Sequence, residues 1–201
     1  YVHSLGFLDQ ARYLRYQFRR LGASVTLLKN RLREDAVNIV FGAHLGFPLE
    51  LLERHACVFV NLEQLGAGGA ALAPQYFALL RDKPVLDYDQ NNPQVYSSDP
   101  AAVPIIEFGF APYLVPAASE AKPLCERPVD LLFFGSMNER RKSFIAKITA
   151  AGGKVTVLDK PLYGKERDEM VRSAKAVLNC QFYDTNRFEQ ARAFQCMSLG
   201  T

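Results

Sequence analysis

Short apolar runs alternate with amphipathic helical patterns along most of this chain, and that alternation limits the fold more than any other feature. The runs "AVNIVFGA" (36–43) and "CVFVNLEQL" (57–65) are rich in β-branched residues and predict buried strands. Between Leu8 and Leu21 the apolar residues recur at three- and four-residue intervals, and Gly22 follows as a stop signal. Strands that alternate with helices build a mostly parallel sheet covered on both faces. The sequence therefore predicts an α/β fold.

The same pattern continues on both sides of residue 128. In the first part, further strands are predicted at 24–28, 83–89 and 103–110, with helices at 48–56 and 74–82. Pro48 opens the first of these helices, where proline suits the first helical position. In the second part, strands are predicted at 129–135, 154–158 and 176–182, with helices at 139–151, 165–174 and 186–199.

The segment 111–128, "APYLVPAASEAKPLCERP", carries four prolines and no clear period. Such a segment is typical of a connection between two domains. We predict two Rossmann-like lobes with mostly parallel sheets, at 1–115 and 129–201, joined by a linker at 116–128. The first lobe opens with a helix and the second ends after three strands, so we expect a fold that is truncated at both ends.

Composition excludes several classes of protein. Of the 201 residues, 49% are hydrophobic and 22% are charged, which describes a globular protein with enough apolar material for a core. There is no apolar run long enough to cross a bilayer and no signal-peptide pattern. A formal charge of +3, spread along the chain, argues against nucleic-acid binding. Four cysteines without a CxxC pair or zinc spacing favour a reduced, cytoplasmic protein.

The stretch "LLFFGSMNERRKSF" (131–144) is the first candidate for a binding site. A buried strand, a glycine and a helix start leave several backbone N–H groups for an anion, and Arg140 and Arg141 add donors suited to phosphate. The alternative is a capping box, in which Ser136 caps the helix and Glu139 follows three residues later, with the arginines in solvent. The spacing alone does not decide between the two.

The last predicted helix, in "DTNRFEQARAFQCMSLG", is the second candidate. Phe188, Phe194 and Met197 share its apolar face, whereas Glu189 and Arg192 lie three residues apart on another. The alternative here is a capping pair of Asn186 and Glu189 beside an exposed arginine.

These two stretches carry a resemblance to a known family. "VDLLFFGSMNERRKSFIAKITAAGGKVTVL", followed by "YGKERDEMVRSAKAVLNCQFYDTNRFEQARAFQCMSLGT", resembles the nucleotide-binding lobe of GT-B glycosyltransferases, closest to the bacterial CgeB-type (spore-maturation-like) group. "VFVNLEQL" and "KPVLDYD" resemble the first lobe of that group, so the resemblance covers most of the chain. It implies two Rossmann-like lobes of GT-B type, with the acceptor side in the first lobe and the nucleotide-sugar donor in the second.

The resemblance also implies a donor site without a metal or other cofactor. In GT-B enzymes the glycine loop after the first strand of the second lobe approaches the donor diphosphate, which corresponds to Gly135 and Ser136. An acidic residue at the last helix contacts ribose or sugar hydroxyls, and Glu189 matches that place. The predicted donor-binding set is Gly135, Ser136, Asn138, Arg140, Arg141, Tyr163, Phe188, Glu189 and Gln190.

A catalytic base is expected from the first lobe. His44 follows a buried run at the carboxyl end of a predicted strand, where open α/β sheets bind ligands. His3 precedes the first helix, and Glu63 is the third candidate, also at a strand end. Asp87 and Asp89 form a "DYD" that is superficially like a metal-binding DxD, and we do not assign a metal to it.

The sequence thus predicts a glycosyltransferase that moves a sugar from a nucleotide-diphosphate sugar to a hydroxyl acceptor. The alternative is a non-catalytic module that binds a sugar nucleotide or a protein on a degenerate GT-B fold. A Rossmann oxidoreductase is disfavoured, because no GxGxxG follows any predicted strand.

Overall fold

The computed structural model describes residues 1–2, 4–158, 160–184 and 187–201 of the chain. They divide into two compact units, Tyr1–Glu107 and Phe108–Thr201, each with helices and one parallel three-stranded sheet. The predicted α/β class with parallel sheets is confirmed. The two units are described separately below.

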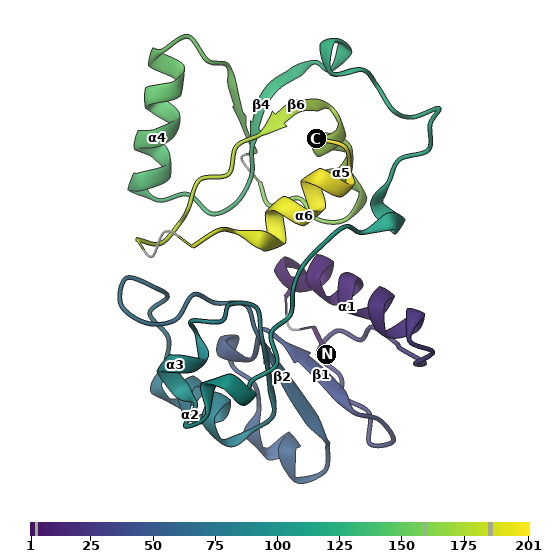
Figure 1. Ribbon diagram of the computed structural model, residues 1–201, viewed down its shortest axis with the longest axis vertical. Coiled ribbons are helices and arrows are strands. Elements are labelled where there is room, and N and C mark those ends of the chain that lie inside the picture. Colours follow the sequence, from purple (N-terminus) through teal and green to yellow (C-terminus); the bar gives the residue numbers. More distant parts are fainter. Residues whose placement is uncertain (3, 159, 185–186) are drawn as a thin grey trace. The chain divides into compact units, whose positions relative to one another are not determined.

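The first unit is built on three neighbouring parallel strands in the order β1-β2-β3. These strands are β1 (Asn38–Phe41), β2 (Cys57–Asn61) and β3 (Val85–Asp87). Figure 1 draws α1 on one side of this sheet and α2 and α3 on the other. The helices are α1 (Leu8–Arg20), α2 (Pro74–Asp82) and the short α3 (Pro93–Tyr96).

Three sequence predictions in this unit are wrong in type. The segments 24–28 and 103–110 do not form strands. Lys29, just after the first segment, makes a single-residue bridge to Val2, and Ile105 in the second makes one to Asp87. Residues 24–28 are exposed or half-buried, so their β-branched side chains lack the packing that a central strand receives. The predicted helix at 48–56 is a 3-10 helix over Leu49–Glu53.

The first two residues lie at the β1 edge of this sheet. Val2 bridges Phe41 in parallel on one side and Lys29 in parallel on the other. The Val2 N–H donates to the Leu28 carbonyl at 2.9 Å, and the Phe41 N–H donates to the Tyr1 carbonyl at 3.0 Å. From Val2 the chain passes through α1 to Lys29 on one side of Val2. It then continues to β1 on the other side of Val2.

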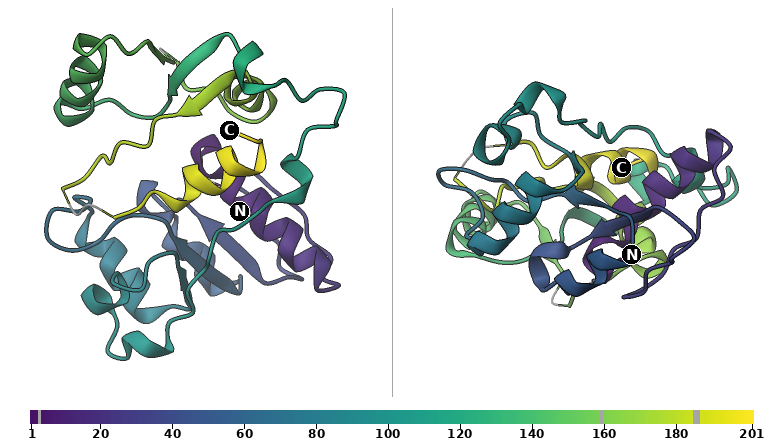
Figure 2. Two further views of the ribbon diagram at one scale, coloured as in Figure 1. Left: turned by 45° about the horizontal axis from the view of Figure 1, so that its top comes forward. Right: turned by 90° about the horizontal axis from the view of Figure 1, so that it is seen from below.

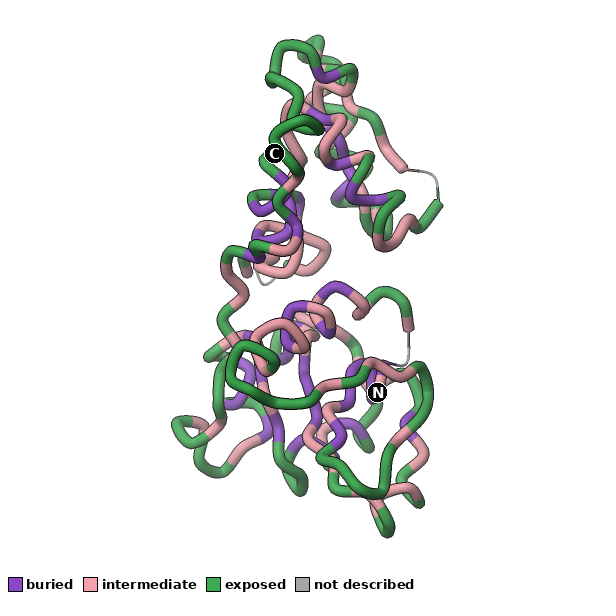
Figure 3. The backbone as a smooth tube through the Cα atoms, turned by 90° about the vertical axis from the view of Figure 1, so that its right-hand side faces the viewer, coloured by how far each residue is buried: buried purple, intermediate pink, exposed green. Residues whose placement is uncertain are grey.

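The core of the first unit lies on β1 and β2 and under α2. Val40, Phe59 and Leu65 are wholly buried there, and Phe47 packs edge-on against Phe59 with ring centroids 5.2 Å apart. Figure 3 shows buried stretches of the backbone in both units. Burial of apolar side chains of this size is the main favourable contribution to folding.

The second unit has the strand order β5-β4-β6, again all parallel. Its strands are β4 (Val129–Phe133), β5 (Val155–Val157) and β6 (Ala174–Val177). Its helices are α4 (Glu139–Ala150), α5 (Lys165–Arg172) and α6 (Gln190–Ser198). In Figures 1 and 2, α4 covers one face of the sheet and α5 the other, as right-handed crossovers in opposite directions require.

The segment predicted as a linker, 116–128, belongs to the second unit, and the boundary falls after Glu107 rather than near residue 115. Hydrogen bonds explain this placement. Arg127 donates to the carbonyls of Ala174 and Gly200, both at 2.9 Å, and the Ala111 N–H donates to Ser198 Oγ at 2.9 Å. The proline-rich segment is therefore attached to β6 and to the end of α6.

Membrane-spanning helices are absent from the described ranges, since none of the helices found there combines the necessary length and apolarity.

Candidate functional site

The strand order of the second unit places a reversal of chain direction beside β4. The chain leaves β4 for β5 on one side and then crosses to β6 on the other. In open α/β sheets, ligands bind outside the carboxyl ends of the strands at such a switch point. Two side chains join the segments that follow β4 and β6 here: Asn138 Nδ2 donates to the Phe182 carbonyl at 2.8 Å, and Arg141 Nε donates to the Cys180 carbonyl at 2.8 Å.

Gly135 follows β4 at this point with a φ of 130°. A Cβ added here would lie 2.9 Å from Arg192 Nη2 and 3.4 Å from Arg141 Nη1. The backbone conformation is one that side chains of other residues rarely adopt, and the space for a side chain is already filled by guanidinium groups. The glycine therefore lets two arginines approach the backbone after β4.

Glu189 lies between these two arginines. Its Oε1 pairs with Arg141 Nη2 at 2.5 Å, and its Oε2 pairs with Arg192 Nη2 at 2.7 Å. The side chains of Arg141, Glu189 and Arg192 are 3%, 17% and 10% exposed. We call these three residues the arginine cluster. Two guanidinium groups and one carboxylate leave an excess of one positive charge in a place that water reaches poorly.

Aromatic rings make cation–π contacts with both guanidinium groups. Arg192 lies over the rings of Phe133 and Phe134, both at 5.4 Å, and Arg141 lies over Phe133 at 5.3 Å and Phe182 at 5.1 Å. Burial lowers the pKa of Arg192, Glu189 opposes that shift, and the charge of Arg141 adds to it. An anion at this site would favour the charged form of Arg192.

The start of α4 differs from the predicted capping box. Asn138, not Ser136, is the N-cap, and its Oδ1 accepts from the Arg141 N–H at 3.0 Å. The Ser136 carbonyl accepts from Arg141 Nη1 at 2.7 Å, and Glu139 pairs with Lys142 at 2.8 Å. The capping interpretation of Ser136 is wrong, because Asn138 lies one residue before the helix and offers the better-placed acceptor.

The other residues of the predicted donor set lie at or just before the starts of α4, α5 and α6. Arg140 is exposed and pairs with Asp184. Tyr163 is half-buried in the segment between β5 and α5. Phe188 is 60% exposed, and Gln190 is the first residue of α6. The alternative capping pair with Glu189 includes Asn186, which lies outside the described residues.

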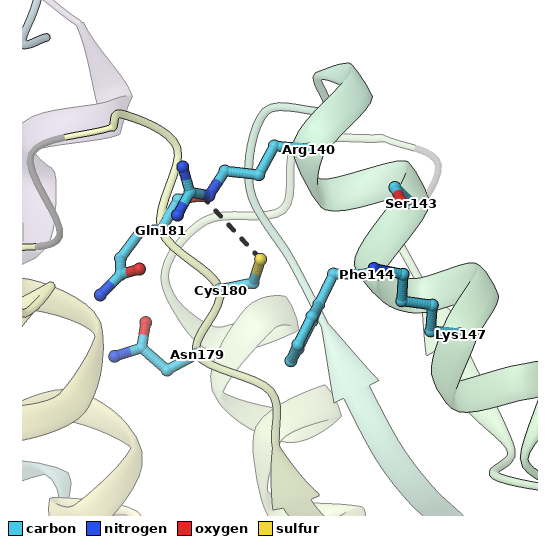
Figure 4. Close-up of a pocket in the computed structure, with 7 residues that line it drawn as sticks. All are labelled: Arg140, Ser143, Phe144, Lys147, Asn179, Cys180 and Gln181. Atoms are coloured by element: carbon cyan, nitrogen blue, oxygen red, sulfur yellow. Dashed lines mark hydrogen bonds between the residues drawn. The ribbon is translucent and has the colours of Figure 1, made fainter.

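A hollow of about 390 Å³ opens next to the arginine cluster, between α4 and the segment after β6. Figure 4 shows that α4 contributes Arg140, Phe144 and Lys147 to it, whereas Asn179, Cys180 and Gln181 come from the other side. Asn179 also connects it to the cluster, because its Oδ1 accepts from Arg192 Nη1 at 3.3 Å.

Arg192 is the residue that the sequence prediction left out of the donor set. Its alternative interpretation as an exposed arginine is wrong, since its side chain is only 10% exposed. The available signal was its position three residues after Glu189, a spacing at which helical side chains meet.

In the first unit, the structure brings two of the three candidate bases together. His44 follows β1 and its Nε2 lies 3.4 Å from Glu63 Oε1, with side-chain exposures of 12% and 19%. The rings of Phe7 and Tyr76 stand edge-on to the imidazole, with centroids at 5.7 Å and 5.6 Å. His3, the remaining candidate, lies outside the described residues.

Asp87 of the "DYD" sequence is fully buried and accepts hydrogen bonds from Asn61, Asn92 and Tyr96. These bonds occupy both of its oxygens with protein donors. Within the part of the chain that the structure describes, no group of three or more His, Cys, Asp or Glu residues is arranged to hold a metal ion.

No protein-family model, curated protein or solved structure matches this chain. The resemblance to GT-B glycosyltransferases therefore stays a prediction from the sequence alone.

Proposed function

We propose that this chain is a GT-B-type glycosyltransferase that transfers a sugar from a nucleotide-diphosphate sugar to a hydroxyl acceptor without a metal. The observation that supports the proposal most is the arginine cluster beside Gly135, at the switch point of the second unit. A site with two guanidinium groups, one carboxylate and a closely approaching backbone suits the charge of a diphosphate.

In this proposal the arginine cluster stabilises the leaving group. Negative charge grows on the diphosphate as its bond to the sugar breaks, and donors already in place stabilise that charge without reorganising. Glu189 and the aromatic rings hold Arg141 and Arg192 in fixed orientations before any ligand arrives. Glu189 thus acts through the arginines, besides any contact with sugar or ribose hydroxyls.

The His44–Glu63 pair supplies the base. The acceptor oxygen attacks the anomeric carbon, the bond from that carbon to the diphosphate oxygen breaks, and the hydroxyl proton passes to the His44 imidazole. Glu63, 3.4 Å from His44 Nε2, stabilises the imidazolium that forms.

A non-catalytic binding module is the second candidate. One observation favours it: both oxygens of Glu189 are already paired with arginines, so this carboxylate has less capacity for a sugar hydroxyl. Such a module would bind a sugar nucleotide at the arginine cluster and leave it intact.

A matched pair of glycine variants tests the binding step. Gly135 and Gly152 both have positive φ, but a Cβ at Gly152 meets nothing within 4 Å. We expect UDP or GDP to raise the melting temperature of the full chain, Gly135→Ala to remove that rise, and Gly152→Ala to keep it. A wild-type chain that responds to no nucleotide in a panel of UDP, GDP, ADP and their sugar derivatives would refute the proposal.

Catalysis is tested separately at His44. His44→Gln is expected to keep the nucleotide-induced rise in melting temperature and to lose sugar transfer or sugar-nucleotide hydrolysis. Hydrolysis that continues unchanged in this variant would remove His44 as the base. A wild-type chain that binds a nucleotide but consumes no sugar nucleotide would favour the binding module.

A further inference from the structure

A network of buried polar side chains lies at the carboxyl ends of β2 and β3 in the first unit. Asn61, Asp87 and Asn92 are each 0% exposed, although they are polar or charged. Buried groups of this kind are costly unless hydrogen bonds satisfy them, and a fully satisfied network fixes a single arrangement. We call these three residues the amide–carboxylate network.

The network holds the backbone of Glu63 at both of its polar groups. The Glu63 N–H donates to Asn61 Oδ1 at 3.1 Å. The Glu63 carbonyl accepts from Asn61 Nδ2 at 3.1 Å and from Asn92 Nδ2 at 2.9 Å. The loop after β2 is therefore tied down at the residue whose carboxylate faces His44.

Asp87 orients both amides that hold Glu63. Its Oδ2 accepts from Asn61 Nδ2 at 2.9 Å, and its Oδ1 accepts from Asn92 Nδ2 at 2.8 Å. A carboxylate can only accept here, so each amide must turn its nitrogen toward Asp87. The amide oxygens then face the N–H groups of the loop, where Asn92 Oδ1 accepts from the Leu65 N–H at 2.8 Å.

Tyr76 connects the network to the imidazole itself. Its hydroxyl donates to Asn61 Oδ1 at 3.1 Å, and its ring stands edge-on to His44. Burial raises the pKa of Tyr76, and the charges of Glu63 and Asp87 add to that shift, so the hydroxyl remains a donor at neutral pH. Tyr76 contacts His44, and Asn61 holds the backbone of Glu63. The hydrogen bond between Tyr76 and Asn61 therefore links the two partners of the His44–Glu63 pair.

We infer that Asn61 and Asn92 are positioning residues for the His44–Glu63 pair, and that buried Asp87 fixes their amides. The catalytic meaning of this inference rests on the function proposed above, whereas the positioning itself does not. The competing explanation is that the network only stabilises the core, in which case its disruption would lower stability without changing the surroundings of His44.

The experiment follows the His44 imidazole by NMR as the pH is varied between about 5 and 8, in the full chain and without any donor. The chain has three histidines, and a His44→Gln spectrum assigns the signal. Glu63→Gln defines the change caused by loss of the Glu63 charge. Asn92→Ser, which removes one of the amides that hold Glu63, is expected to move the titration midpoint of His44 in the same direction and by a smaller amount.

Tyr96→Phe is the matched control. Its hydroxyl donates to Asp87 Oδ2 at 3.0 Å, and its loss leaves every bond to Glu63 in place. We expect this variant to lose stability but to leave the titration of His44 unchanged. If Asn92→Ser does not fold, Asn61→Ser takes its place, because it removes the other amide that holds the backbone of Glu63.

A folded Asn92→Ser or Asn61→Ser chain with the wild-type His44 titration would overturn the inference. A Tyr96→Phe chain that shifts the titration as far as Asn92→Ser would also overturn it, since the effect would then follow stability and not the hold on Glu63. Because the measurement needs no substrate, the positioning can stand even if sugar transfer is never observed, and the two proposals fail separately.

Discussion

The two units share an architecture but use opposite chemistry at the carboxyl ends of their strands. Each has parallel strands and a reversal of chain direction, at Val2 beside β1 in the first unit and at β4 in the second. The first unit has amides around the buried Asp87 at the carboxyl ends of β2 and β3, and the second has two arginines around the half-buried Glu189 after β4 and β6. The fold thus fixes where a site lies, and the side chains decide what it can hold.

The two carboxylates illustrate the difference. Asp87 accepts hydrogen bonds mainly from neutral donors, and burial raises its pKa while those bonds oppose the shift. Glu189 faces two full positive charges. The first arrangement rigidifies a loop, whereas the second leaves a surplus of positive charge for an anion.

The largest effect is expected in the second unit from Glu189→Ala. This change leaves Arg141 and Arg192 close together and buried without their shared carboxylate, which we expect to cost about 3–5 kcal/mol of the free energy of unfolding. Urea unfolding followed by circular dichroism measures it. A loss as small as that of an exposed pair would show that the arginines do not depend on Glu189.

Asp87→Asn is expected to have the largest effect in the first unit, about 2–3 kcal/mol. The new amide nitrogen would face side chains that all donate to Asp87, so buried donors would lose their acceptors. The same unfolding measurement applies. Tyr96→Phe, which removes a single donor, should cost only about 1 kcal/mol, and equal losses would contradict the network.

Alkaline pH should weaken the second unit through Cys196. Burial raises the pKa of this thiol to about 11, whereas the unfolded thiol ionises near its ordinary value. The stabilisation is complete below the unfolded pKa and is lost as the pH rises through the folded one, by roughly 3 kcal/mol in total. Unfolding at pH values of about 8 and 10.5 in wild type and Cys196→Ala tests this, since the alanine variant should lose that part of the pH dependence.

The smallest effect is expected from Arg140→Ala. Arg140 and Asp184 have side-chain exposures of 41% and 84%, and exposed ion pairs contribute little. We expect a change below about 0.5 kcal/mol in the same assay. A much larger loss would show that Arg140 contributes to stability as a buried residue does, and not as part of an exposed ion pair.

Local pattern was sufficient for the buried strands and the long helices. β1, β2, β3, β4 and β5 lie within predicted strands, whereas β6 begins two residues before the strand predicted at 176–182. The runs at 24–28 and 103–110 have similar composition, but they lie at the edges of the sheet and make only single-residue bridges. Composition does not report whether a run is covered on both faces.

The sequence by itself determined the α/β class, the position of the glycine after β4 and the residue types at both candidate sites. Tertiary structure decided the partners. It showed that Arg192 shares Glu189 with Arg141, that Asn138 caps α4, and that Asn61 and Asn92 hold Glu63 beside His44. The physical reason is that strand and helix patterns depend on neighbours in the chain, whereas ion pairs and buried hydrogen bonds join residues that only the sheet brings together.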